Sequence, residues 1–144
     1  MALKDAIDEI IDELQTITDI KRVPDEPPES ANQFPFAVVY PLTGDYKFGP
    51  PPLMRALHNI NIELHVARRD LPRDYLSVME IIDVIPKELW NKLRVSGFTY
   101  LDTFGGEDSG ITYQFGPLSW GGVDTLGVTY TIPMVKIFTD VSAI

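Results

Sequence analysis

The 144-residue chain has 44% hydrophobic and 23% charged residues, and 21 acidic against 12 basic side chains give it a net charge of −9. A chain of this length buries enough apolar surface to fold without disulfides or metals, so we expect residues 1–144 to form a single domain. The absence of cysteine excludes disulfide frameworks, zinc–thiolate and iron–sulfur sites, and cysteine nucleophiles.

The acidic balance also limits the partners of the chain. Affinity for nucleic acid comes largely from basic side chains that neutralise phosphates, so sequence-specific nucleic-acid binding is disfavoured. An acidic surface past which DNA slides without adhering is still compatible with this charge. The N-terminal residues carry acids throughout, and no stretch approaches about 18 consecutive apolar residues, so we expect a soluble, cytoplasmic chain without signal peptide or membrane span.

The first predicted element is an amphipathic helix over residues 3–18. Apolar side chains recur at steps of three and four and form one stripe, which comprises Leu3, Ile7, Ile10, Ile11, Leu14 and Ile17. The acidic residues between them fall elsewhere on the helix, and we interpret them as a solvated face rather than a metal site.

A proline-rich and acidic loop over 24–33 then leads to a short apolar run, FPFAVVYP at 34–41. This run predicts a strand whose ends, or whose edge position, are marked by Pro35 and Pro41, because proline donates no ladder hydrogen bond. The following segment at 42–52 is rich in proline and glycine, and we expect a long exposed loop that is functional or is ordered by a partner. Its candidate contact residues are Tyr46, Lys47 and Phe48.

The clearest strand signal lies at 57–68. Ile60, Ile62, Leu64 and Val66 alternate with Asn59, Asn61, Glu63 and His65. One face of this strand should therefore meet a core, and the polar face should meet water or a partner. A second helix is predicted over 70–93, with a break or kink at Pro86 and a restart over 86–93.

The last third of the chain reads as β-structure. Strands are predicted at 98–104, 111–120 and 125–139, with a turn at 105–110, and together they suggest a β-meander. Pro133 within the last run indicates an edge position or a bulge. The order of elements predicts an α+β fold, with two main helices packed on a largely antiparallel or mixed sheet.

No constellation in the sequence predicts catalysis. His58 and His65 lie seven positions apart on one predicted strand, so they should point to opposite faces and should not share a metal, and His65 is expected at a surface or interface. The serines, the glycine-rich turns and the paired carboxylates lack the contexts of a nucleophile elbow, a phosphate loop or an acid–base pair. We therefore expect no enzyme activity, no metal and no cofactor.

Two features instead suggest contacts with other chains. Arg68, Arg69 and Arg73 form a local basic group, and we hypothesise that they contact the acidic first helix of a neighbouring copy. The aromatic residues of 42–52, the segment near Trp120 and the long final strand offer more apolar edge than a monomer needs, and exposed edges are ways for subunits to associate.

The order of parts resembles that of the tail terminator (tail completion) proteins of long-tailed bacteriophages, and of related neck or head–tail joining proteins. The likeness covers nearly the whole chain: the N-terminal helix LKDAIDEIIDELQ, the strand FPFAVVYP, the loop LTGDYKFGPPP, the strand-to-helix unit beginning HNINIELHVARRDLPRDYL, and the final hairpin ITYQFGPLSWGGVDTLGVTYTIPMVKI.

This resemblance implies a homo-oligomeric ring, commonly a hexamer, in the tail or neck of a virion assembled in the host cytoplasm. Such a ring caps the tail tube protein, ends tube polymerisation and offers a docking surface to the head connector or neck proteins, with DNA passing through an acidic lumen. The alternative from the residues themselves is a small-molecule or peptide-binding module that uses the strand face of Asn59, Asn61, Glu63 and His65.

Overall fold

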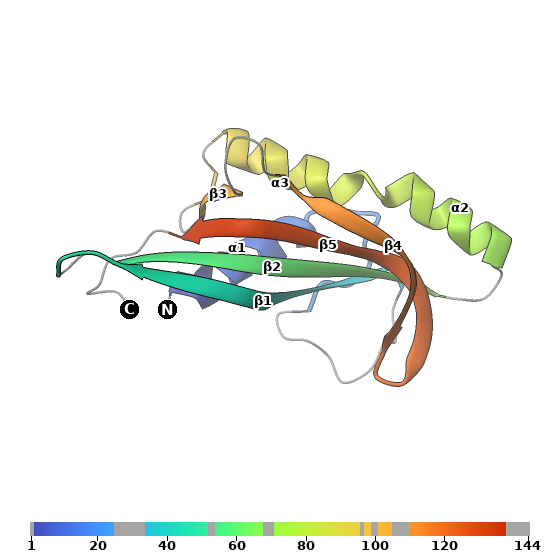
Figure 1. The fold of residues 1–144 in the computed structure, drawn as a ribbon. Helices are drawn as coiled ribbons and strands as arrows, with labels where there is room; N and C mark the ends of the chain where they lie inside the picture. Colours follow the sequence, from blue (N-terminus) through green and yellow to red (C-terminus); the bar gives the residue numbers. More distant parts are fainter. Residues whose placement is uncertain are drawn as a thin grey trace.

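The computed structural model describes residues 2–24, 34–51, 54–67, 71–95, 97–98, 101–104 and 110–137. It has an α+β fold, as the sequence predicts, with helices packed on one face of an antiparallel sheet (Figure 1). In chain order the elements are α1 (Ala2–Gln15), β1 (Phe36–Phe48), β2 (Met54–Ala67), α2 (Leu71–Ile81), α3 (Val84–Arg94), β3 (Leu101–Phe104), β4 (Thr112–Trp120) and β5 (Val123–Ile137).

The strands follow the order β1-β2-β5-β3, and β4 also pairs with β5. The last three strands are therefore not the expected meander, because β3 and β4 each pair with a different part of the long β5 rather than with one another. The expected edge position of Pro133 is also wrong, since β5 lies inside the sheet. The alternative expectation of a bulge is confirmed, because the register between β2 and β5 shifts between the pairs His58↔Val135 and Ile60↔Ile132.

The hydrophobic core lies between the sheet and the helices. The predicted stripe of α1 supplies Ile10, Ile11 and Leu14, which are at most 1% exposed. The apolar face of β2 meets them as expected, together with buried apolar residues of β1 and β5. The helices α2 and α3 add Val78, Ile85 and Leu89 to the same core. The part of the chain that the structure describes has no helix that is long and apolar enough to span a membrane.

The second predicted helix is two helices. α2 ends at Ile81 and α3 begins at Val84, so the break lies before Pro86, and Pro86 itself sits in the first turn of α3. A proline lacks the amide hydrogen that would bond the carbonyl four residues earlier, and its ring crowds that carbonyl. Here that carbonyl belongs to Ile82, and it accepts a hydrogen bond from the hydroxyl of Tyr130 at 2.5 Å instead.

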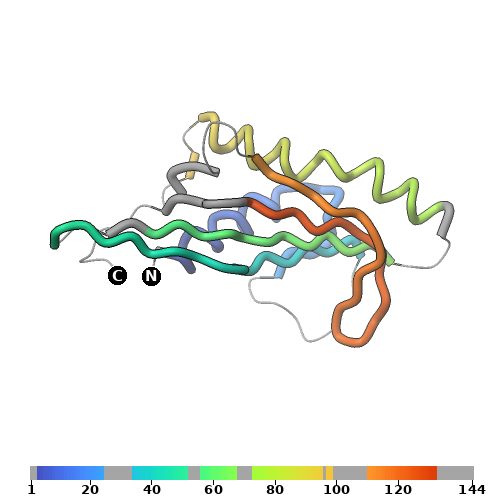
Figure 2. The backbone as a smooth tube through the Cα atoms, in the orientation of Figure 1, coloured from blue at the N-terminus to red at the C-terminus, as the bar shows by residue number. Residues whose placement is uncertain are grey.

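The first strand is longer than its prolines suggest. β1 continues past Pro41 to Phe48, and its register against β2 shifts between Pro41 and Thr43, so that Leu42 forms a bulge. The predicted loop at 42–52 is thus mostly strand. Its hairpin with β2 projects past the ends of the helices as an arm, by which we mean residues 42–51 of β1 and the tip together with the start of β2 that pairs with them (Figures 1 and 2).

Candidate functional site

The arm presents two different faces. Tyr46 and Phe48 lie on the helix side of the sheet, because Tyr46 pairs with Ala56 and packs edge-on against the ring of His58 at 5.6 Å between centroids. Lys47 points to the opposite face, since neighbouring residues of a strand alternate. The three candidate contact residues therefore form an aromatic pair and a separate charge rather than one cluster.

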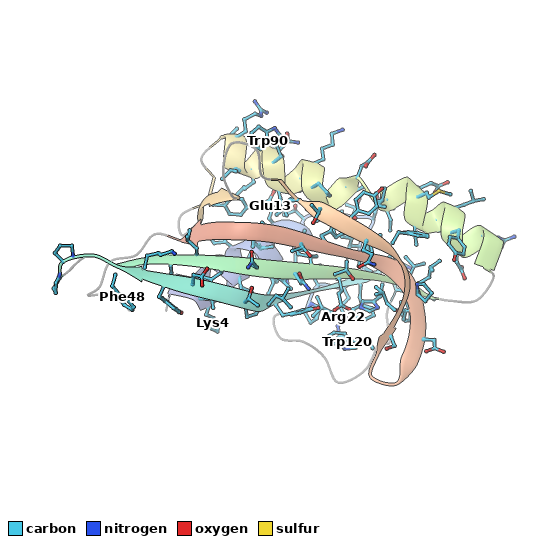
Figure 3. All side chains as sticks on the ribbon, in the orientation of Figure 1. Lys4, Glu13, Arg22, Phe48, Trp90 and Trp120 are labelled. Carbon is cyan, nitrogen blue, oxygen red and sulfur yellow. The ribbon has the colours of Figure 1, made fainter. Side chains whose placement is uncertain are left out.

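The aromatic pair is exposed to solvent. All residues from Pro41 to Phe48 are exposed, and the side chains of Tyr46 and Phe48 are 52% and 76% accessible. Figure 3 shows Phe48 on the arm, beyond the helices. Large apolar side chains exposed side by side are typical of a surface that a partner covers.

A second group of exposed apolar side chains lies on the helical layer. Leu76 and Met79 of α2 are 59% and 55% exposed, and Trp90 of α3 is 58% exposed and points away from the sheet (Figure 3). Of the predicted basic group, Arg73 is exposed in the first turn of α2, whereas Arg68 and Arg69 lie outside the described residues. The structure therefore leaves the proposed basic cluster untested.

The sheet face that bears no helix carries a chain of polar side chains. Because β2 alternates as predicted, this face holds Asn61, Glu63 and His65, which meet polar residues of β1 and β5. The contacts are Thr131 Oγ1 to Asn61 Oδ1 at 3.0 Å, Asn61 Nδ2 to Tyr40 Oη at 3.4 Å, Tyr40 Oη to Glu63 Oε2, His65 Nε2 to Glu63 Oε1 at 3.0 Å, and His65 Nδ1 to Thr125 Oγ1 at 2.6 Å.

The Glu63 carboxylate fixes the direction of the two hydrogen bonds that it receives. A carboxylate accepts but does not donate, so Tyr40 donates its hydroxyl proton and His65 donates from Nε2, both to Glu63. The tautomer that carries its proton on Nε2 accepts at Nδ1 from the hydroxyl of Thr125. Burial opposes ionisation of the Glu63 carboxyl, but the bonds from His65 and Tyr40 outweigh it and lower the pKa of Glu63. These hydrogen bonds therefore converge on the ionised carboxylate of Glu63.

His65 is buried, which corrects the expected surface or interface position. Its imidazole is 0% exposed, stacks on the ring of Phe36 at 4.6 Å and meets Trp120 edge-on at 5.7 Å. The segment near Trp120, expected to be free apolar surface, thus folds back and packs its indole against this face. Gly116 and Gly127 face one another in the β4–β5 ladder, and a Cβ on Gly127 would collide with the carbonyl oxygen of Leu64.

The contacts of Thr125, His65 and Glu63 have the order hydroxyl, imidazole, carboxylate that nucleophilic catalysis uses. Thr125 is 0% exposed, however, so its hydroxyl does not reach a substrate. The series of hydrogen bonds instead links β1, β2 and β5. His58 lies on the other face of β2, as predicted, where burial lowers its pKa. The described residues contain no group of three or more His, Asp or Glu side chains that could hold a metal ion.

An acidic cleft of about 260 Å³ lies between α1 and α3. Its lining includes Glu9, Asp12 and Glu13 of α1 and Lys92 of α3, whose Nζ is 3.3 Å from Glu13 Oε2. A hydrogen bond with Glu13 raises the pKa of nearby Glu88, so these two carboxyls resist being ionised together. Asp12 is exposed, as predicted for the solvated face of the first helix, whereas the Glu13 side chain is 12% exposed and is partly neutralised by Lys92.

Sequence reasoning identified the polar face of β2 but missed the residues that complete it. Tyr40, Thr125 and Trp120 come from three other strands, and nothing in their local pattern marks them as partners of Glu63 or His65. No protein-family model matches the chain, and no curated protein is similar to it in sequence. The likeness to tail terminator proteins therefore stays a prediction.

Proposed function

We propose that this chain is a structural assembly protein. Copies of it associate into a ring that caps a phage tail tube, ends its polymerisation and presents a docking surface to the head connector. In this proposal the chain works by contact rather than by chemistry, and its partners are further copies, the tube protein and the neck proteins.

The observation that carries the proposal is the arm. A monomer has no use for eight consecutive exposed residues that extend a strand past the rest of the fold, and the two aromatic rings of Tyr46 and Phe48 increase the cost of leaving it in water. An exposed strand that ends a sheet is also a ready template for another chain. The arm is therefore best explained as a contact element.

A second surface supports association in more than one direction. Exposed apolar side chains on α2 and α3 are Leu76, Met79 and Trp90, and these two helices lie away from the arm (Figure 1). Two distinct contact surfaces on one subunit are what a closed ring requires, since each subunit has two neighbours. The net charge of −9 suits a ring whose lumen DNA crosses without adhering.

The proposal is tested by measuring the mass of the purified chain in solution by light scattering and by imaging the same sample in negative stain. We expect closed rings of roughly six subunits with a central hole, as the resemblance to tail terminators implies. The double substitution Tyr46→Ser and Phe48→Ser should lower the ring fraction, whereas Tyr113→Ser, at an aromatic residue that is 61% exposed on β4, should not. A chain that stays monomeric at every concentration, or compact dimers without a hole, would contradict the ring.

A further inference from the structure

The outer edge of β1 is open along the arm. β1 is the first strand in the sheet order, and no strand of the described part of the chain pairs with its outer side. A short contact covers the beginning of this edge, where the amide of Ala37 donates to the carbonyl of Arg22 at 2.9 Å. From Pro41 to Phe48 every residue is exposed.

The Ala37 contact shows which backbone groups face outward. Amides and carbonyls of a strand point alternately to its two neighbours, so Ala37, Val39 and Pro41 face the open edge, and Phe36, Val38 and Tyr40 face β2. Pro41, which has no amide hydrogen, therefore lies where no ladder bond within this sheet is lost.

The bulge at Leu42 resets this alternation. Thr43 pairs with Asn59, and odd-numbered residues of β2 face β1, so Thr43, Asp45 and Lys47 now face β2. The outward-facing residues of the arm are consequently Gly44, Tyr46 and Phe48.

We propose that two copies of this chain pair along these edges, antiparallel and with Tyr46 opposite Tyr46 on a twofold axis. In this register Gly44 of one copy lies opposite Phe48 of the other, and all three outward-facing residues meet outward-facing partners. The pairing extends the sheet across two copies, which is a common mode of strand recognition. The inference rests on the proposed self-association and names one of its contacts.

The charges of the arm select this register. Pairing Tyr46 with Tyr46 places Asp45 of each copy opposite Lys47 of the other, and opposite charges on facing residues stabilise a sheet. A shift of the centre by one residue would place Asp45 opposite Asp45, or Lys47 opposite Lys47. Within its own hairpin Asp45 lies directly opposite Leu57, and Lys47 lies directly opposite Arg55, so neither residue faces a residue of opposite charge.

The side chains on the other face fit as well. Tyr46 and Phe48 share the helix-side face, so each Phe48 ring meets Gly44 of the other copy, which has no side chain to displace it. The two Tyr46 rings meet at the axis. This arrangement covers the exposed aromatic side chains of the arm, those of Tyr46 and Phe48. A twofold contact of this kind closes a ring when it alternates with a second twofold contact on each subunit, and on its own it gives a dimer.

The absence of cysteine makes the register directly testable. In the proposed pairing, the two Cα atoms of residue 46 lie about 5.5 Å apart, within the range of a disulfide. Mild oxidation of Tyr46→Cys should therefore give a cross-linked dimer. Asp45→Cys and Lys47→Cys, each alone, should stay largely uncross-linked, and their mixture should give a mixed dimer. Efficient cross-linking of either variant alone, or none with Tyr46→Cys, overturns the register.

A charge exchange tests the same contact without cysteine. Lys47→Asp places two pairs of acids opposite one another, and we expect the dissociation constant of the arm contact to rise roughly tenfold or more. The exchanged variant Asp45→Lys with Lys47→Asp restores both opposite pairs and should return within about twofold of the original value. Equal weakening by both variants contradicts the pairing.

The outcomes separate this inference from the proposed function. Rings that form without any Tyr46→Cys cross-link would refute the arm pairing and leave the ring standing. Cross-linked dimers without rings would support the arm pairing and refute the ring. A monomer in every variant would refute both.

Discussion

The hydroxyl of Tyr130 holds the junction between α2 and α3, and removing it gives a sharp test of how the break in the helix is stabilised. Tyr130 is 0% exposed, and its hydroxyl donates to the Ile82 carbonyl at 2.5 Å. Burial, and next the nearby Asp83 carboxylate, raise the pKa of Tyr130, so the hydroxyl keeps its proton and stays a donor. Tyr130→Phe leaves the carbonyl without this bond and changes little else.

The expected cost follows from this geometry. A partly buried carbonyl that loses its hydrogen bond costs about 1–2 kcal/mol, which corresponds to a fall in Tm of about 2–8 °C for a chain of this size. Pro86 has no amide hydrogen to donate to the Ile82 carbonyl. The amide of the next residue, Lys87, already bonds the Asp83 carbonyl four residues earlier at 3.2 Å, so the backbone here follows the helical pattern. The substitution Pro86→Ala would therefore supply an amide that bonds the Ile82 carbonyl.

A double-mutant cycle measured by thermal or urea unfolding tests this explanation. The cost of Tyr130→Phe should be smaller in the Pro86→Ala background by about 0.5–1 kcal/mol, because the new amide replaces the lost donor. A cost below about 0.5 kcal/mol for Tyr130→Phe alone, or equal costs in both backgrounds, would refute the role given to this hydroxyl.

Three further predictions concern the sheet and the core. Because the pKa of Glu63 is lowered in the folded state, its carboxylate stabilises the fold at pH values above the ordinary pKa of 4.5, and this stability is lost as the pH falls through the lower folded-state pKa. The difference in Tm between the wild type and Glu63→Gln should therefore narrow on acidification. A difference that stays constant with pH would contradict this. Gly127→Ala should cost about 1–3 kcal/mol because its Cβ meets the neighbouring strand, whereas Gly116→Ala, with no atom within 4 Å of a new Cβ, should change stability by less than about 0.5 kcal/mol; equal effects would refute the close approach. In urea unfolding, Ile10→Ala should cost about 2–5 kcal/mol and Leu42→Ala, at a side chain 54% exposed on the arm, less than about 0.5 kcal/mol; a reversed order would be inconsistent with the core described.

The fold class and most element positions follow from local pattern. The periodicity of α1 and the alternation of β2 reflect contacts that each element makes with one core, and both are readable from neighbouring residues. The pairing of β3 and β4 with β5 is not readable from neighbouring residues, because it depends on the length of β5, which lies further along the sequence. The break before Pro86 was displaced from its predicted position because proline acts on the carbonyl four residues earlier, that of Ile82.

The candidate site was predictable in part for a similar reason. Alternation placed Asn61, Glu63 and His65 on one face, but the register between strands decides that Tyr40 and Thr125 meet them. The two prolines suggested that the first strand would stop at 41. It continues because a bulge follows Pro41 and because the missing amide hydrogen faces the open edge, and neither fact is visible in the local sequence.

The proposed association of copies through the arm can be tested by light scattering on a variant with a shortened arm. In this variant the dipeptide Asn-Gly replaces residues 46–56 and joins the facing residues Asp45 and Leu57 by a tight turn. Circular dichroism checks that the fold is kept. We predict that the full chain has a mass that is a multiple of 16.2 kDa. The shortened variant should be a monomer, with a mass of 16.2 kDa less that of the 9 residues removed on balance. Equal association of the two proteins, or a monomeric full chain at every concentration, would contradict the proposed association through the arm.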